Sequence, residues 1–344
     1  MLPPDVVVTE HLKSNARAIF VYACGTFCTL LIGTKNSFLT GLPNIFSPSL
    51  NKNARVALVS PAGPIAGEED LERSRENARS LGWEPVTGKH AGRKNGYLAG
   101  EDAQRAEDLN DAIRSADIDG IWCVRGGYGA MRLLDDIDYA ALANNPKPII
   151  GYSDITAIHS AIYNKTSLVT FHGPTAREKL SDFSRASLVK AVVEQADPCG
   201  VAPTAREISP GRAEGRLAGG NLSLIASLVG TPYALDLEGA ILVIEDVNEP
   251  LYRLDRMMHQ LLLAGALDGI RGIALGDFTG VEEDGSIEQL DALLGGFARK
   301  LRVPCLAGIP VGHIPEQWTL PLGAAATLDT AGRRLTVNFT QADQ

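Results

Sequence analysis

Ser153 stands at the junction of two periodic patterns and is a candidate nucleophile. Residues 147–150 predict a short buried strand, and Ile155, Ile158 and Ile162 recur after it at helical spacing. A strand-to-helix turn exposes a hydroxyl above the sheet, and free N–H groups at the helix start can stabilise an oxyanion. Ser153 could instead cap the helix, since the segment lacks the second glycine of the Gly-x-Ser-x-Gly motif.

A glycine-rich loop, Arg125-Gly-Gly-Tyr-Gly129, follows the apolar run 120–124 and precedes a helical pattern through Leu134. Glycines let backbone N–H groups approach a ligand, so the loop could hold a phosphate, form half of an oxyanion hole, or make a plain tight turn. The phosphate alternative is disfavoured, because the loop has neither the Lys-Ser/Thr pair of a Walker sequence nor the spacing Gly-x-Gly-x-x-Gly.

A serine hydroxyl needs a base, and a histidine base needs a carboxylate to hold its tautomer. Glu245 and Asp246 end the apolar run 241–244, and His313 lies in a loop rich in glycine and proline at 308–316. Spacing cannot choose among six histidines, and some could be hydrogen-bonded structural residues. These histidines are His11, His90, His159, His172, His259 and His313.

The elements that must position these residues alternate between strands and helices. Strands are predicted at 55–60, 120–124 and 147–150, and helices at 68–81 and 101–116. This alternation indicates a parallel sheet with helices on both faces.

The chain after residue 196 reads as a linker followed by a second α/β domain. Pro198, Pro203 and Pro210 interrupt residues 197–215, where we expect a linker. Beyond it, strand-like pieces surround a predicted helix at 252–263. These pieces lie at 239–244, 272–275 and 324–339.

Composition excludes several classes of protein. The 344 residues are 45% hydrophobic and 21% charged, which predicts a globular chain of about two domains. The net charge of −9 argues against nucleic-acid binding, which needs a basic face. Five scattered cysteines, without Cys-x-x-Cys or His-Glu-x-x-His, support neither a disulfide framework nor a zinc site. We therefore predict no metal and no cofactor.

Residues 1–53 differ from the rest and are predicted to be a leader that is non-native, signal-like or disordered. The uncharged, largely apolar run 18–33 follows Lys13 and Arg17, as in an export signal. As a helix it would span about 24 Å, less than the roughly 30 Å of a bilayer core. The alternatives are a start site placed too early, a signal, or an anchor, and the folded enzyme is expected to begin near Ala54.

Together these motifs resemble the serine LD-carboxypeptidases, which include murein tetrapeptide carboxypeptidases and microcin-immunity peptidases. The resemblance spans roughly residues 56–328. Its motifs are Ser60-Pro-Ala-Gly63, Tyr97-Leu-Ala-Gly-Glu-Asp102 with Arg105, Arg125-Gly-Gly-Tyr-Gly129, Lys147-Pro-Ile-Ile-Gly-Tyr-Ser-Asp-Ile-Thr156, Phe171-His-Gly-Pro174, Gly219-Gly-Asn-Leu-Ser223, Ile244-Glu-Asp-Val-Asn-Glu-Pro250 with Tyr252 and Asp255-Arg256, and Gly312-His313.

The resemblance implies a role for each site residue. Ser153 would be the nucleophile, His313 the base and Glu245 the orienting carboxylate, and the backbone N–H groups of Gly127 and Asp154 would form the oxyanion hole. It also implies an N-terminal flavodoxin-like α/β domain (54–196) and a smaller C-terminal α/β domain (216–340). The triad would form only across their interface.

The function expected from the resemblance is hydrolysis of the L,D-amide bond to a terminal D-Ala of murein tetrapeptide, in peptidoglycan recycling. A cytoplasmic homodimer is implied, or an exported or anchored protein if residues 18–33 act as a signal. The alternatives are a microcin-immunity-type peptidase acting on an aminoacyl-nucleotide analogue, and a catalytically inactive peptide-binding relative.

Overall fold

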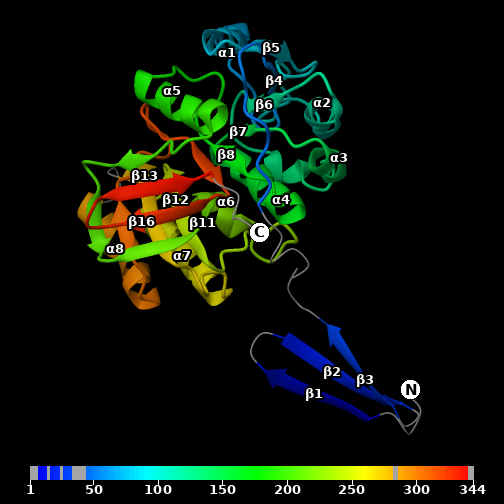
Figure 1. Ribbon diagram of the computed structural model, residues 1–344, viewed down its shortest axis with the longest axis vertical. Helices are drawn as coiled ribbons and strands as arrows, with labels where there is room; N and C mark the ends of the chain where they lie inside the picture. The colour runs from blue at the N-terminus through cyan, green and yellow to red at the C-terminus, as the bar shows by residue number, and fades with distance from the viewer. Residues whose placement is uncertain (1–6, 14–15, 24–25, 33–43, 282–285, 340–344) are drawn as a thin grey trace. The chain divides into compact units, whose positions relative to one another are not determined.

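The computed structural model describes residues 7–13, 16–23, 26–32, 44–281 and 286–339, and the chain divides into two units, residues 1–42 and 43–344. In the first unit, antiparallel strands lie in the order β1 (Val7–Lys13), β2 (Ala16–Ala23) and β3 (Thr26–Ile32) (Figure 1). The signal-like run 18–33 falls on β2 and β3, with residues 24, 25 and 33 outside the described part. Within the described ranges, no helix is both long and apolar enough to cross a bilayer.

The second unit includes residues 44–53, the last residues of the predicted leader. Ile45 forms a bridge with Leu168, and the Leu50 N–H donates to the Val192 carbonyl over 2.8 Å. The Leu50 side chain is 1% exposed and packs in the same core cluster as Trp83. Residues 44–53 therefore belong to the packed body, which starts earlier than the expected Ala54.

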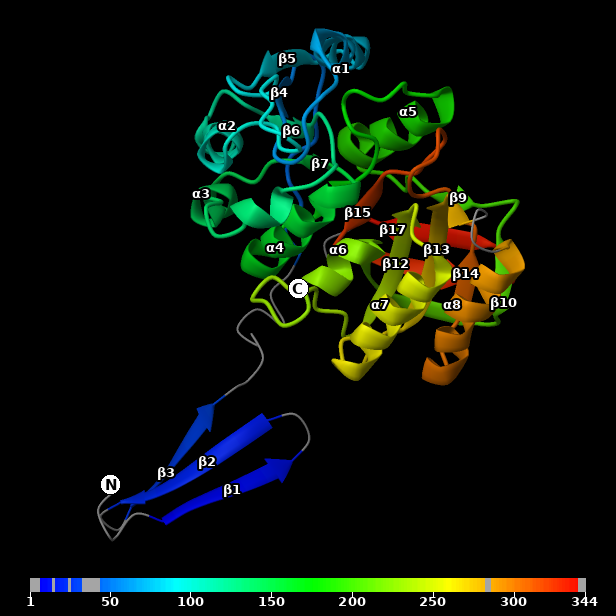
Figure 2. The same cartoon turned by 180° about the vertical axis from the view of Figure 1, so that it is seen from behind.

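A six-stranded sheet forms the first half of this unit, and only its edge strand β15 is antiparallel (Figure 2). Its order, β5-β4-β6-β7-β8-β15, gives the first five strands of this unit, β4 to β8, the 2-1-3-4-5 order of flavodoxin-like folds. The strands are β4 (Arg55–Val59), β5 (Glu84–Thr87), β6 (Gly120–Cys123), β7 (Ile149–Gly151), β8 (Thr170–His172) and β15 (Leu320–Leu322). The helices are α1 (Glu68–Ser80), α2 (Asp102–Arg114), α3 (Tyr139–Asn144), α4 (Thr156–Thr166) and α5 (Asp182–Val189), with shorter turns η1 (Ala130–Leu133), η2 (Ser153–Ile155) and η3 (Lys190–Glu194).

Both faces of this sheet are covered, which explains why its central strands β4, β6 and β7 are largely apolar. Ala57 and Val59 pack in a core with residues of α2, α3 and α4, whereas Val56 and Leu58 pack in a second core with residues of α1 and α5. The strand order reverses between β4 and β6. In open α/β sheets a ligand site lies beyond the carboxyl ends of the strands at such a point.

A second, eight-stranded sheet has a parallel centre and antiparallel edges. Its order is β10-β14-β13-β12-β11-β16-β17-β9, and α6, α7 and α8 share one core with it (Figure 2). The strands are β9 (Gly200–Val201), β10 (Arg206–Ser209), β11 (Arg212–Asn221), β12 (Ala240–Val247), β13 (Gly272–Thr279), β14 (Cys305–Ala307), β16 (Ala325–Asp329) and β17 (Arg334–Asn338). The helices are α6 (Leu222–Ser227), α7 (Leu251–Leu263) and α8 (Ile287–Leu301).

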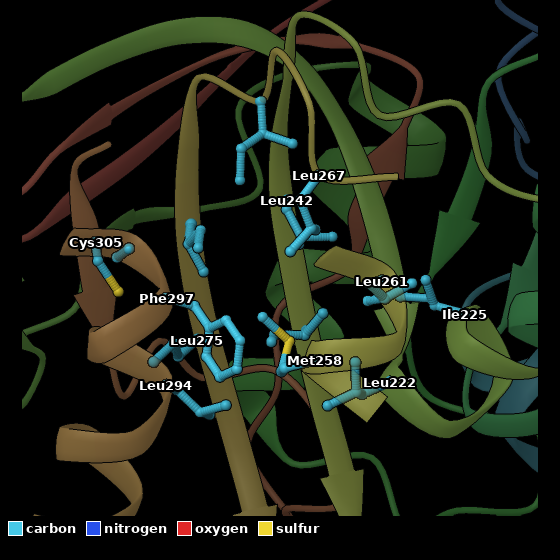
Figure 3. Close-up of a cluster of buried hydrophobic side chains, with 14 of the residues drawn as sticks. Leu222, Ile225, Leu242, Met258, Leu261, Leu267, Leu275, Leu294, Phe297 and Cys305 are labelled. Carbon is cyan, nitrogen blue, oxygen red and sulfur yellow. The ribbon is translucent and has the colours of Figure 1, made fainter. Parts of the chain in front are cut away.

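The core between these helices and the sheet follows from helical periodicity. Leu254, Met258 and Leu261 recur along one face of α7 and are at most 1% exposed. Figure 3 shows Met258 between Phe297 of α8 and Leu222 of α6, and Leu261 beside Ile225 of α6, in the core that also contains Leu242 of β12. This packing fixes the end of β12, where Glu245 and Asp246 lie.

Residues 197–215, where the sequence predicts a linker, contain β9, β10 and the start of β11. Pro198, Pro203 and Pro210 lie before or between these strands, where proline removes no ladder hydrogen bond. The prolines therefore interrupt the sequence pattern without preventing this stretch from joining the second sheet.

Candidate active site

Ser153 has a left-handed backbone, with φ +63°, at the turn between β7 and α4. A residue other than glycine adopts this conformation at a cost of about 1–3 kcal/mol, and such strain is concentrated at functional turns. Buried Ile149 and Ile150 hold the turn on one side, and Ile155 and Ile158 on the other. The packed sequence on both sides therefore imposes a sharp turn on the serine.

The glycine loop lies directly against this turn. A Cβ on Gly126 would lie 2.9 Å from the Cβ of Ser153, so no larger residue fits there without movement. The Gly63 N–H, from the loop after β4, donates to the Gly126 carbonyl over 2.9 Å, and the Ala130 N–H donates to the Asp154 carboxylate over 2.8 Å. Loops after three neighbouring strands thus meet around Ser153, and they include the predicted oxyanion residues Gly127 and Asp154.

His313 connects Ser153 to Glu245. Its Nε2 is 3.1 Å from Ser153 Oγ, and its Nδ1 is 2.8 Å from Glu245 Oε2. The Glu245 side chain is fully buried, whereas 21% of the His313 side chain is exposed. The structure therefore brings the three predicted side chains into one hydrogen-bonded line, with the carboxylate at its buried end.

Close backbone packing lets the histidine loop approach β12 and β13. Gly312 has φ +125°, and a Cβ there would lie 3.0 Å from the Cβ of Glu245. The Asp277 N–H donates to the Val311 carbonyl over 2.8 Å, and the Thr279 hydroxyl donates to the His313 carbonyl over 3.2 Å. These two hydrogen bonds fix the position from which the imidazole reaches both partners.

The carboxylate of Asp246, next to Glu245, accepts hydrogen bonds from other residues. Its carboxylate accepts from Asn221 Nδ2 over 2.9 Å and from the Ser223 N–H over 2.9 Å, at the start of α6. This difference in partners, which no alternation count predicts, leaves Glu245 to bond the histidine.

Burial and the charge of Glu245 shift the pKa of His313 in opposite directions. Burial raises the pKa of the Glu245 carboxyl. Burial alone would lower the pKa of His313, but the hydrogen bond and charge of Glu245 outweigh it, so the pKa of His313 is raised. Burial also raises the pKa of Asp154 to about 6. The carboxylate of Glu245 therefore favours the imidazolium form of His313, as a proton shuttle requires.

The other histidines with described side chains take no part in this line of hydrogen bonds. His159 Nε2 lies 2.8 Å from the Gly151 carbonyl, and burial lowers the pKa of His159 to about 4 and that of His172 to about 3. His90 pairs with Glu107, and His259 pairs with Asp255. His11 is in β1, and its side chain is outside the described part.

Thr156 contributes to the site in a way that sequence reasoning missed. Its hydroxyl accepts from the Asn221 N–H over 3.0 Å, and a Cβ on Gly220 would lie 2.5 Å from that oxygen. The contact joins the helix after Ser153 to the end of β11, beside β12. The available signal was its place three residues after Ser153 in the same motif.

Within the described part of the chain, no three His, Cys, Asp or Glu side chains are grouped so that they could hold a metal ion. The chemistry that this site offers is that of a nucleophile, a base and an orienting carboxylate beside a glycine loop.

Two family models match most of the chain. The LD-carboxypeptidase N-terminal domain matches residues 56–173, and the LD-carboxypeptidase C-terminal domain matches residues 214–328. The chain belongs to the LD-carboxypeptidase family. The family and the α/β fold class predicted from the sequence are thereby confirmed.

Relatives of this chain cover most of its length. The murein tetrapeptide carboxypeptidase of Pseudomonas aeruginosa is 35% identical over 82% of this chain and 95% of its own. The crystal structure of muramoyltetrapeptide carboxypeptidase from Oxalobacter formigenes, 29% identical, superposes with a TM-score of 0.71 over 83% of this chain and 98% of its own. The microcin C7 self-immunity protein MccF, 25% identical, gives a TM-score of 0.79 over 87% and 100% of the two chains.

Proposed function

We propose that the protein is a serine LD-carboxypeptidase that removes the terminal D-Ala from a murein tetrapeptide, in peptidoglycan recycling. The observation that carries the proposal is the hydrogen-bonded line from Ser153 through His313 to Glu245. The names of the relatives from Pseudomonas aeruginosa and Oxalobacter formigenes support the substrate class.

In the first half of the reaction, Ser153 Oγ attacks the carbonyl carbon of the L,D-amide while His313 Nε2 takes the hydroxyl proton. The N–H groups of Gly127 and Asp154 stabilise the oxyanion that forms. The imidazolium then gives its proton to the amine of D-Ala, the C–N bond breaks, and the peptide is left as an ester on Ser153.

In the second half, His313 takes a proton from water, which attacks the ester. The imidazolium returns that proton to Ser153 as the peptide carboxylate leaves. Glu245 acts in both halves, because its hydrogen bond keeps the proton on Nδ1 and its charge stabilises the imidazolium.

The structural similarity to MccF supports a second candidate, a peptidase that acts on an aminoacyl-nucleotide analogue. Both candidates use the same nucleophile, so they differ in the substrate and not in the catalytic residues. Turnover of an aminoacyl sulfamoyl nucleoside with none of murein tetrapeptide would establish the second candidate.

Release of D-Ala from murein tetrapeptide, followed by mass spectrometry, tests the proposal. Ser153→Ala should lower kcat by about 10⁴- to 10⁶-fold, because the nucleophile and base act as a unit. Ser80→Ala, an exposed serine at the end of α1, is the matched control and should leave kcat unchanged. Equal turnover by Ser153→Ala would exclude the serine mechanism, and binding without turnover would support an inactive relative.

The homodimer and the cytoplasmic location implied by the sequence resemblance belong to the same proposal. Light scattering of the full chain measures the oligomeric state, and cell fractionation measures the location. A monomer, or a protein found outside the cytoplasm, would contradict the corresponding part.

A further inference from the structure

A cleft of about 460 Å³ opens next to the glycine loop. Gly127, Tyr128 and Gly129 line one side with Asp154, so the cleft is continuous with the residues around Ser153. The facing residues include Ser223, at the start of α6, and several from α7 or just before it: Glu249, Arg253, Arg256, Met257 and Gln260. The volume is in the range of pockets that bind small ligands.

Three arginines, Arg132, Arg253 and Arg256, line this cleft together with the carboxyl groups of Asp154 and Glu249. Arg132 forms an ion pair with Asp102, whose carboxylate oxygens lie 2.6 Å and 2.9 Å from its guanidinium nitrogens. Arg253 Nε lies 2.8 Å from the carboxylate of Glu249. Within the described residues Arg256 has no acidic partner; its guanidinium lies over the ring of exposed Tyr252, 5.4 Å from the centroid.

Arg253 and Arg256 are three residues apart on α7, so they share one face of the helix. Like charges at this spacing repel each other, and Glu249 offsets only one of them. Burial raises the pKa of the Glu249 carboxyl. An anion bound between the two guanidinium groups would remove the repulsion.

We propose that this cleft binds a carboxylate of the substrate peptide through Arg253 and Arg256; the inference rests on the proposed function. A guanidinium group matches a carboxylate because two N–H donors can reach both oxygens. A murein tetrapeptide offers that group at its terminal D-Ala and, where the third residue is diaminopimelate, on that side chain. The two sources share one chemistry, and the experiment below separates them.

Binding is measured by calorimetry on the full chain with Ser153→Ala, which prevents turnover. The ligands are the diaminopimelate tetrapeptide, the same peptide amidated at the terminal carboxylate, and the same peptide amidated on the diaminopimelate side chain. Adding Arg256→Gln should raise the Kd of the unmodified peptide about tenfold, as expected for loss of a charge-assisted hydrogen bond in a partly solvated cleft. Arg253→Gln should have a similar effect.

Amidation identifies the carboxylate. One of the amidated peptides should bind about tenfold more weakly than the unmodified peptide, and its Kd should not change further on Arg256→Gln. Arg256→Lys should retain part of the affinity, because it keeps the charge. Arg299→Gln, at an exposed position of α8 outside the cleft, is the matched control and should leave every Kd unchanged.

Failure of this inference can be told apart from failure of the proposed function. A protein that releases D-Ala, but binds all three peptides equally, overturns the carboxylate site and leaves the enzyme. A protein that binds in an arginine-dependent way, with no hydrolysis by the unmodified chain, overturns the enzyme and leaves the carboxylate site. A Kd unchanged by Arg256→Gln in a variant with an unaltered circular dichroism spectrum also overturns the site.

Discussion

At the scale of single residues, the base in the proposed mechanism is governed by one buried contact. His313 must be neutral at Nε2 to accept the serine proton, yet the Glu245 contact raises its pKa. Activity should therefore fall on the acid side as the pH drops through this raised pKa, since the imidazole is then already protonated. The same contact that stabilises the imidazolium thus sets the lower limit of the working pH range.

Glu245→Gln tests this relation. Removing the charge lowers the pKa of His313, so the acid limb of kcat/KM should move to lower pH. At the same time kcat should fall, on the order of 10³- to 10⁴-fold, because the tautomer is no longer held. The measurement is a pH–rate profile of D-Ala release.

Glu107→Gln is the matched control, because Glu107 contacts His90 away from the site. Its profile should coincide with that of the unmodified protein. An acid limb that stays in place in Glu245→Gln would show that a group other than His313 controls it.

Much of the site could be predicted from local sequence, but not all of it. The turn at Ser153 is encoded by contiguous residues, so strand, serine and helix are visible together. The choice of Glu245 over Asp246 depends on Asn221 and Ser223, which belong to another strand and helix. The closeness of His313 depends on small residues such as Gly312, whose role appears only when the neighbouring strand is in place.

At the scale of elements, β10 and α8 show why the predicted linker is part of the second sheet. β10 pairs with β14, and its Ile208 packs against α8 where Gly295 lies. A four-residue strand between prolines gives no readable alternation in sequence. Its structure is imposed by the helix and strand that cover it.

Two neighbouring glycines on α8 test this packing. A Cβ on Gly295 would lie 2.2 Å from Ile208 Cγ2, whereas a Cβ on Gly296 would have no neighbour within 4 Å. Gly295→Ala should lower the free energy of unfolding by about 1–3 kcal/mol, because the helix must move away from β10. Gly296→Ala should raise it by about 0.5–1 kcal/mol, because alanine favours the helix.

Urea denaturation of the two variants and the unmodified chain measures these changes. The pair serves as its own control, since both substitutions add one methyl group to the same helix. Equal effects of the two substitutions would contradict the docking of β10 on α8.

At the scale of the whole molecule, residues 44–53 stabilise the second unit. Leu50 fills a space beside Trp83, and its Cδ2 lies 2.8 Å from where a Cβ on Gly120 would be. The free energy of unfolding of a chain that starts at Ala54 should therefore be about 2–5 kcal/mol lower than that of a chain that starts at Pro43, as expected for loss of a buried leucine. Chemical denaturation of the two shortened chains measures the difference.

Leu50→Ala in the full chain separates the side chain from the rest of the segment. If the leucine side chain accounts for the effect, Leu50→Ala should reproduce most of the decrease in the free energy of unfolding. Equal denaturation midpoints for the chains starting at Pro43 and Ala54 would contradict a structural role for residues 44–53.

The strand β15 joins the first sheet from near the far end of the sequence, pairing Leu320 with His172. While the chain is being synthesised, β8 has therefore no partner on its outer side until residue 322 has left the ribosome. An open strand edge is a template for pairing with other chains. Folding of the nucleophile-bearing half is thus completed only after translation of the half that carries Glu245 and His313, so a nascent chain cannot finish one half of the site before the other.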